Sequence, residues 1–201
     1  MIKNLVNKMN TTNKKPVSRT LYMTQLSMLS ALIVILTFTP LGFVPIGPIW
    51  ATIVHIPVII GAIIMGPLAG AILGLVFGLC SLFKALQVGD IITVTIFVYN
   101  PQITIIPRIL IGVFAGYTYR LLLPMVDKLG ITAITVSAII GTATNSVLVI
   151  SGIYLFTPQY APLILPLIVP SIIETTLAVI IAVPICKALL VYQGRMKPKS
   201  L

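Results

Sequence analysis

Acidic side chains are almost absent from this 201-residue chain, which has three Asp and Glu residues against thirteen Lys and Arg residues. Metal-assisted hydrolysis and phosphoryl transfer need several carboxylates in one site, so this shortage disfavours both reactions. The motifs of zinc hydrolases, serine hydrolases and P-loop ATPases are also missing from the sequence. We therefore expect a protein that is not an enzyme and that holds no metal ion or cofactor itself.

Histidine and cysteine are equally scarce. The single histidine, His55, has no Cys, Asp or Glu at ligand spacing and cannot complete a closed metal site. The two cysteines, Cys80 and Cys186, are too few for a disulfide framework, and we expect both to be packing residues.

Charge of either sign is low, at 8% of residues, whereas 58% of residues are hydrophobic. So few polar side chains cannot coat a soluble globule, and we therefore predict an integral membrane protein in a lipid bilayer. The net charge of +10 could suggest a nucleic-acid partner. However, the basic residues lie in short tails and loops beside apolar segments, not along one face, so we expect no nucleic-acid binding.

Apolar runs interrupted by Pro and Gly predict an all-α fold with six transmembrane helices. The predicted spans are residues 21–38, 51–65, 67–83, 103 or 107 to 123, 131–156, and a last one that starts between 162 and 170 and ends at 191. The first run is longer than a signal-peptide core and lacks a small-x-small cleavage site, so we interpret it as a span. Only Gly66 and Pro67 separate the second and third spans, which indicates a tight helical hairpin.

The distribution of Lys and Arg predicts the orientation. Only Lys84 and Arg108 flank the spans on one side. The basic residues on the other side are Lys3, Lys8, Lys14, Lys15, Arg19, Arg120, Lys128, Lys187, Arg195, Lys197 and Lys199. By the positive-inside rule both termini are cytoplasmic. We expect basic cytoplasmic tails at residues 1–19 and 193–201, and a six-helix membrane domain at residues 20–192.

Placing a polar residue within or beside a span costs free energy in a bilayer, and such residues are functional candidates for that reason. The candidates gather near the outer side, where a cation could bind an anionic group of a solute and amides could form hydrogen bonds. They are Trp50, His55, Lys84, Asn100, Arg108, Asn145 and Glu174. The apolar, Pro- and Gly-rich outer loop at residues 40–50 is expected to fold back as a lid.

Structural explanations compete with each assignment. Arg108 could extend to lipid headgroups, and His55 could be a hydrogen-bonded packing residue. Glu174 and Arg108 could form an ion pair between two helices. The aromatic residues at this depth also fit an ordinary interfacial belt; they are Trp50, Tyr99, Tyr154 and Tyr160.

A run of small residues and a spaced pair of small residues both suggest close helix contacts. Residues 141–146, Gly-Thr-Ala-Thr-Asn-Ser, either let helices approach closely or leave room for a solute. In the first span, Ser27 and Ala31 form a small-xxx-small pair on one helix face, where a helix of a partner protein can pack.

Together these features resemble the substrate-binding S-component of energy-coupling factor (ECF) vitamin importers, over nearly the whole chain. The resemblance is carried by six spans in about 190 residues, the basic N-terminus before the Ser27 and Ala31 pair, and the Gly- and Pro-rich first outer loop. It is also carried by residues 55–71, whose Ile-Pro and Gly-Pro-x-x-Gly patterns look like the hairpin of the pantothenate-type members.

The resemblance implies a multi-pass protein of a prokaryotic plasma membrane that binds a vitamin on the external side. Such a protein docks through its first helix, here with Ser27 and Ala31, onto a transmembrane scaffold subunit coupled to two cytoplasmic ATPases. ATP and Mg²⁺ would bind those ATPases. Pantothenate is the favoured vitamin, and folate, niacin and riboflavin are alternatives. A protein of another class, an independent channel or secondary permease, remains the alternative function.

Overall fold

The computed structural model describes residues 19–46, 49–124 and 130–193. Nearly all of both basic tails, and Lys128 in the loop between the fourth and fifth predicted spans, therefore lie outside the described residues. The predicted orientation of the chain in the membrane stays a prediction.

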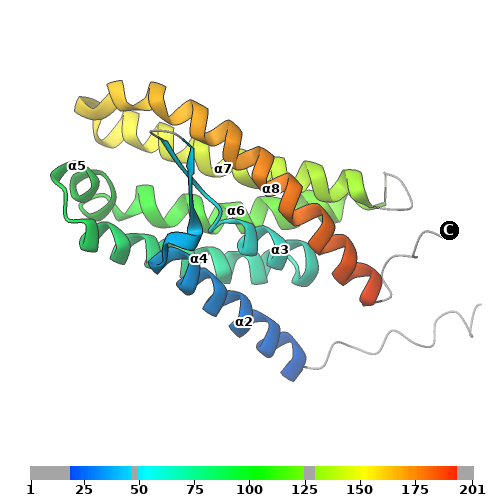
Figure 1. The fold of residues 1–201 in the computed structure, drawn as a ribbon. Coiled ribbons are helices and arrows are strands. Elements are labelled where there is room, and N and C mark those ends of the chain that lie inside the picture. Colours follow the sequence, from blue (N-terminus) through cyan, green and yellow to red (C-terminus); the bar gives the residue numbers. More distant parts are fainter. Residues whose placement is uncertain (1–18, 47–48, 125–129, 194–201) are drawn as a thin grey trace, which may run out of the picture.

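The described chain is a bundle of helices with one small strand hairpin (Figure 1). Its α-helices are α2 (Arg19–Phe38), α3 (Ile56–Met65), α4 (Pro67–Val88), α5 (Ile91–Thr93), α6 (Pro101–Leu122), α7 (Ile131–Phe156) and α8 (Ile164–Tyr192). The shorter elements are the 3-10 helices η1 (Pro40–Gly42) and η3 (Pro158–Leu163), the π-helix η2 (Val94–Val98), and strands β1 (Phe43–Ile46) and β2 (Ile49–Thr52).

Five helices within the described ranges, α2, α4, α6, α7 and α8, are long and apolar enough to cross a membrane. The remaining predicted span is only α3, whose ten residues rise about 15 Å, half of a hydrocarbon core. Its predicted start at residue 51 is wrong, because Ala51 and Thr52 belong to β2 and Pro57 lies in the first turn of the helix. Six complete crossings are therefore not established.

The connections differ from the predicted loops. The connection between the third and fourth predicted spans, which begins at residue 84, is mostly helical. Helix α4 continues to Val88 and ends at Gly89, whose φ of 70° suits a glycine helix cap. Lys84 thus lies on α4. The tight turn at Gly66 is confirmed, with α3 ending at Met65 and α4 beginning at Pro67.

Helix α3 is the centre of the bundle. All its residues from Ile56 to Ile64 are buried, and it packs against α2, α4, α6, α7 and α8. Helix α3 extends along only part of the bundle. None of the described helices continues in line with it beyond Ile56. The hairpin β1–β2 crosses there, from the end of α2 toward α8 (Figure 1). The start of α2 and the end of α8 lie at the opposite end of the bundle, together with the turn between α3 and α4 (Figure 1).

Glycines bring α4 and α6 into backbone contact. A Cβ atom on Gly70 would lie 2.7 Å from the Gly112 carbonyl oxygen, and one on Gly74 would lie 2.8 Å from the carbonyl carbon of Arg108. Small residues four apart permit such close packing between membrane helices. This contact fixes the backbone of α6 at Arg108.

Candidate functional site

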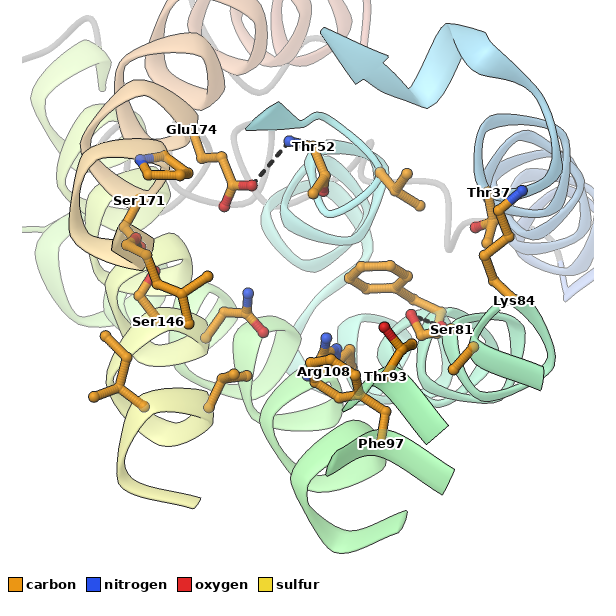
Figure 2. A pocket seen from close by; sticks show the side chains of 18 of the residues that line it. Thr37, Thr52, Ser81, Lys84, Thr93, Phe97, Arg108, Ser146, Ser171 and Glu174 are labelled. Atoms are coloured by element: carbon orange, nitrogen blue, oxygen red, sulfur yellow. Dashed lines mark hydrogen bonds between the residues drawn. The ribbon is translucent and has the colours of Figure 1, made fainter. Parts of the chain in front are cut away.

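A cavity of about 320 Å³ occupies the half of the bundle that α3 does not reach (Figure 2). This volume lies at the lower end of the range of about 300–1,000 Å³ found for small-molecule sites. Its walls come from α2, β2, α4, α5, η2, α6, α7 and α8. They are largely apolar. Their polar members are Thr37, Thr52, Ser81, Lys84, Thr93, Arg108, Asn145, Ser146, Ser171 and Glu174.

Arg108 is held in place by its own helix and by two aromatic rings. The preceding residue, Pro107, has no N–H to donate to the Ile103 carbonyl, and the Arg108 Nη1 donates to that oxygen instead, at 3.0 Å. The guanidinium carbon lies 5.8 Å from the ring centres of both Phe77 and Phe97. Its Nε is buried and has no hydrogen-bond partner in the described parts of the chain. Arg108 is therefore fixed at the cavity wall with one donor unused among the described residues.

The π-helix η2 positions Phe97. Thr104 donates its hydroxyl to the Phe97 carbonyl at 2.7 Å, and Asn100 donates its amide to the Thr95 carbonyl at 2.9 Å. Asn100 also accepts from Gln102 at 3.3 Å. The cavity wall does not include Asn100, which instead joins η2 to α6.

Asp90 caps the short helix that precedes η2. Its carboxylate accepts from the Thr93 backbone N–H at 2.8 Å. Hydrogen bonds from the side chain and backbone of Thr93 lower the pKa of Asp90 below its ordinary value. This cap sets Thr93 at the cavity wall.

Asn145 contributes an acceptor from α7. It lines the cavity, and its Oδ1 is buried with no donor from any described residue. The small-residue run on this helix packs closely at one position and borders the cavity at another. Gly141 packs closely, since a Cβ there would lie 3.1 Å from the Cβ of Ala115, while Ser146 lines the cavity.

Glu174 reaches into the cavity from α8 and is only 8% exposed. Its Oε1 accepts from the backbone N–H of Thr52 at 2.8 Å. Figure 2 shows Glu174 and Thr52 on one side of the cavity and Arg108 on the other. Arg108 therefore bonds its own helix rather than forming the ion pair with Glu174 that the sequence left open.

The remaining predicted residues are placed as follows. Lys84 is half-buried on α4 at the cavity wall, on the same side as Thr37 and Ser81 (Figure 2). His55 is buried directly before α3, and its Nε2 has no partner among the residues described, but it is not part of the cavity wall. The backbone of Trp50 lies in β2, opposite Pro45, and its side chain is outside the description.

Three of the aromatic residues noted in the sequence, Tyr99, Tyr154 and Tyr160, are not part of the cavity wall. Tyr99 and Tyr154 are 74% and 64% exposed, as expected for an interfacial belt. Tyr160 packs against a small cluster that contains Ile103 and Ile153. The two cysteines, Cys80 and Cys186, are buried and unpaired.

Comparison with known proteins gives the family. Residues 21–186 match the family described as ECF transporter, substrate-specific component. The chain belongs to this family. It is thus an S-component and a multi-pass membrane protein of a transporter, as the sequence patterns indicated.

Two curated relatives are similar to this S-component. The pantothenic acid transporter PanT of Lactococcus lactis subsp. cremoris is 39% identical over 124 residues, which cover 54% of this chain and 59% of the relative. The pantothenate transporter PanT of Leuconostoc mesenteroides subsp. mesenteroides is 32% identical over 108 residues, covering 51% and 52%. The matched part spans about half the length of these relatives.

Sequence reasoning missed several residues at the cavity of this S-component. Phe77 lies within an ordinary apolar run, and Phe97 falls in a segment that we expected to be a loop. One signal was available, because a proline directly before the arginine frees a helix carbonyl that the arginine can reach. Ser171 and Thr52 carried no comparable signal.

Proposed function

We propose that this S-component binds a small hydroxylated monocarboxylate, pantothenate, in the 320 Å³ cavity. One observation carries the proposal: the Arg108 Nε and the Asn145 Oδ1 are buried at the cavity without partners from the described residues. Leaving a buried polar group unsatisfied costs about 1–3 kcal/mol. A ligand with an acceptor at one end and a donor further along satisfies both groups at once.

The charge distribution sets the ligand's direction. Arg108 and Lys84 are both cations of the cavity wall, and in Figure 2 both lie away from the carboxylate of Glu174, so the carboxylate of pantothenate binds on their part of the wall. Arg108 is the stronger site, because a planar guanidinium matches the two oxygens of a carboxylate. The hydroxyl and amide groups of the ligand then lie toward Asn145 and Ser171. A flat cation such as thiamin would face two like charges, Arg108 and Lys84, against the one carboxylate of Glu174.

The names of the two relatives support this choice, since both are called pantothenate transporters. Folate, niacin and riboflavin are the competing vitamins. Each is tested by the same titration, in which purified protein is mixed with radiolabelled vitamin and the bound fraction is measured. We expect saturable binding of pantothenate alone. Saturable binding of another vitamin, with none of pantothenate, would contradict the proposal.

In this proposal the S-component transports the vitamin by docking on a partner complex. Ser27 and Ala31 are exposed on α2, and they present small side chains to which the helix of another subunit can pack. In this proposal the vitamin enters the cavity from the external side of the plasma membrane. The S-component then docks through α2 on the transmembrane scaffold of an ECF module, whose two ATPases hydrolyse ATP.

Uptake into proteoliposomes tests this step. Pantothenate uptake should require the ECF module and ATP, and the module subunits should copurify with the S-component. Uptake by the S-component alone, without ATP, would instead indicate an independent channel or permease.

A further inference from the structure

The hydrogen bond between Glu174 and Thr52 joins parts of the chain that are 122 residues apart. Glu174 belongs to α8 and is almost fully buried, whereas Thr52 ends the hairpin strand β2. A buried carboxylate needs donors, and the Thr52 N–H supplies one at 2.8 Å. The partner is a backbone group, so the bond depends on where the hairpin lies and not on the side chain at residue 52.

The geometry of the hairpin explains why this N–H is available. In the antiparallel pair Phe43 lies opposite Thr52, and the next residue, Ile53, donates its N–H to the Gly42 carbonyl at 3.0 Å. The Ile53 N–H therefore points toward β1. The Thr52 N–H points to the other edge of β2, which packs against α8. An unpaired strand edge inside a protein needs a partner, and Glu174 provides it.

The bonded end of the hairpin forms part of the cavity wall. Thr52 and Val54 line the cavity, and Val54 is only 2% exposed. Beneath this end the helix α3 starts at Ile56, so none of the described helices fills the space between α2 and α8 at this level. The described part of the hairpin thus lies across the gap that the short α3 leaves.

We propose that Glu174 is a latch that holds the β1–β2 hairpin against α8 and thereby closes the cavity. In this role Glu174 is a positioning residue for the hairpin and not a contact for the ligand. The inference rests on the proposed function only in naming pantothenate as the solute whose entry and exit the latch controls. The latch itself is a property of the unliganded protein and is tested there.

Three variants separate the latch from other roles. Glu174→Leu removes the acceptor and leaves the Thr52 N–H without a partner. A hydrogen bond to a charged group is worth about 1.5–3 kcal/mol, so the hairpin should open on the order of tenfold to a hundredfold more often. Glu174→Gln keeps an acceptor oxygen and should open at an intermediate rate. Thr52→Pro removes the donor and leaves the carboxylate unchanged, at a strand edge where proline is tolerated.

Opening is measured by the reactivity of a buried reporter, Val54→Cys, toward a water-soluble thiol reagent in the unliganded protein. The parent protein gives the background, because its two cysteines are buried. We expect the labelling rate to rise tenfold or more with Glu174→Leu and less with Glu174→Gln. The control is Thr176→Leu, which places a leucine on the exposed face of the same helix and should change nothing.

The decisive comparison is between the labelling rates of the two single variants and that of the double variant. If both residues act through one bond, Thr52→Pro reproduces the effect of Glu174→Leu and the double variant opens no faster than either. An unchanged labelling rate with Glu174→Leu, an equal rise with Thr176→Leu, or additive effects in the double variant would each overturn the latch. If Thr52→Pro does not fold, the comparison of Leu with Gln at residue 174 decides alone.

Binding kinetics form a separate arm. The dissociation rate of pantothenate should rise with Glu174→Leu by a factor similar to that of the labelling rate, and Glu174→Gln should restore most of the slow dissociation. If pantothenate does not bind the parent protein at all, the proposed function fails while the labelling result still decides the latch. If Glu174→Leu speeds thiol labelling but not the dissociation of pantothenate, the claim that the latch controls exit of the ligand is overturned.

Discussion

Replacing Arg108 with methionine tests the proposed anion site most sharply. Methionine keeps much of the apolar length of the side chain and removes the guanidinium. The carboxylate of a ligand would then enter a half-closed cavity beside Phe77 and Phe97 without its charged partner. Removing one member of a buried, hydrogen-bonded charge pair costs about 2–5 kcal/mol. The Kd for pantothenate should therefore rise by roughly 30-fold to several thousandfold.

The stability of the unliganded protein should change little, because opposing terms are of similar size. Arg108→Met leaves the Ile103 carbonyl without its donor, at a cost of about 1–3 kcal/mol. The loss of two ring contacts adds about 0.5–1 kcal/mol each. Against this, the variant no longer buries a charge whose Nε has no described partner, a penalty of several kcal/mol. We expect a net change within about 1 kcal/mol, or roughly 2–4 °C in melting temperature.

Calorimetric titration and thermal unfolding of purified protein measure both quantities. The matched control is Arg120→Met, which removes the same charge from the exposed last turn of α6, at the end of that helix away from the cavity. It should leave the Kd unchanged. Unaltered binding by Arg108→Met would refute the anion site. A large fall in melting temperature together with lost binding would instead assign Arg108 a structural role.

Three further predictions follow from other contacts. Asn145→Ala should weaken pantothenate binding by about two- to tenfold in the same titration, because one hydrogen bond is worth about 0.5–1.5 kcal/mol; unchanged affinity would exclude Asn145 from the site. Gly112→Val should destabilise the protein by about 1–3 kcal/mol or more in thermal unfolding, since its side chain would meet the α4 backbone; an unshifted melting temperature would contradict this packing. Replacing Ser27 and Ala31 together with leucine should abolish copurification with the ECF module while pantothenate binding persists. Met28→Leu, on the same exposed helix, should retain both, and copurification of the double variant would exclude this docking face.

Much of the helical layout was predictable, because a long apolar run with a clear break at each end has few structural interpretations other than a membrane helix. Helix α7 begins at Ile131 and ends at Phe156 as predicted, and Gly66 forms the expected turn. The grouping of Lys84, Arg108 and Asn145 was predictable for a related reason. Polar residues are costly in a bilayer, so several at one depth indicate a common cavity.

The hairpin was not predictable from these rules. Residues 49–54 are apolar except for Thr52 and continue directly toward α3, and a short apolar run cannot be assigned to strand or helix by periodicity alone. Because α3 begins at Ile56 and not at residue 51, the half of the bundle in which the cavity lies stays open.

Long-range contacts were also beyond the sequence. The rings of Phe77 and Phe97 meet at Arg108 only because Gly74 lets α4 approach α6 and the π-helix η2 turns Phe97 inward. Glu174 was identified as a costly carboxylate that requires a donor, but the donor is a backbone group that no local pattern marks.

A ligand carboxylate bound at Arg108 is the central feature of the proposed site. The most direct test of this contact is an equilibrium titration of the purified parent protein with pantothenate and with pantothenol, in which a hydroxymethyl group replaces the carboxylate. We predict saturable binding of one pantothenate per protein and binding of pantothenol that is weaker by about 2–5 kcal/mol, at least about 30-fold. Equal affinity for the two compounds, or no saturable binding of pantothenate, would contradict the account.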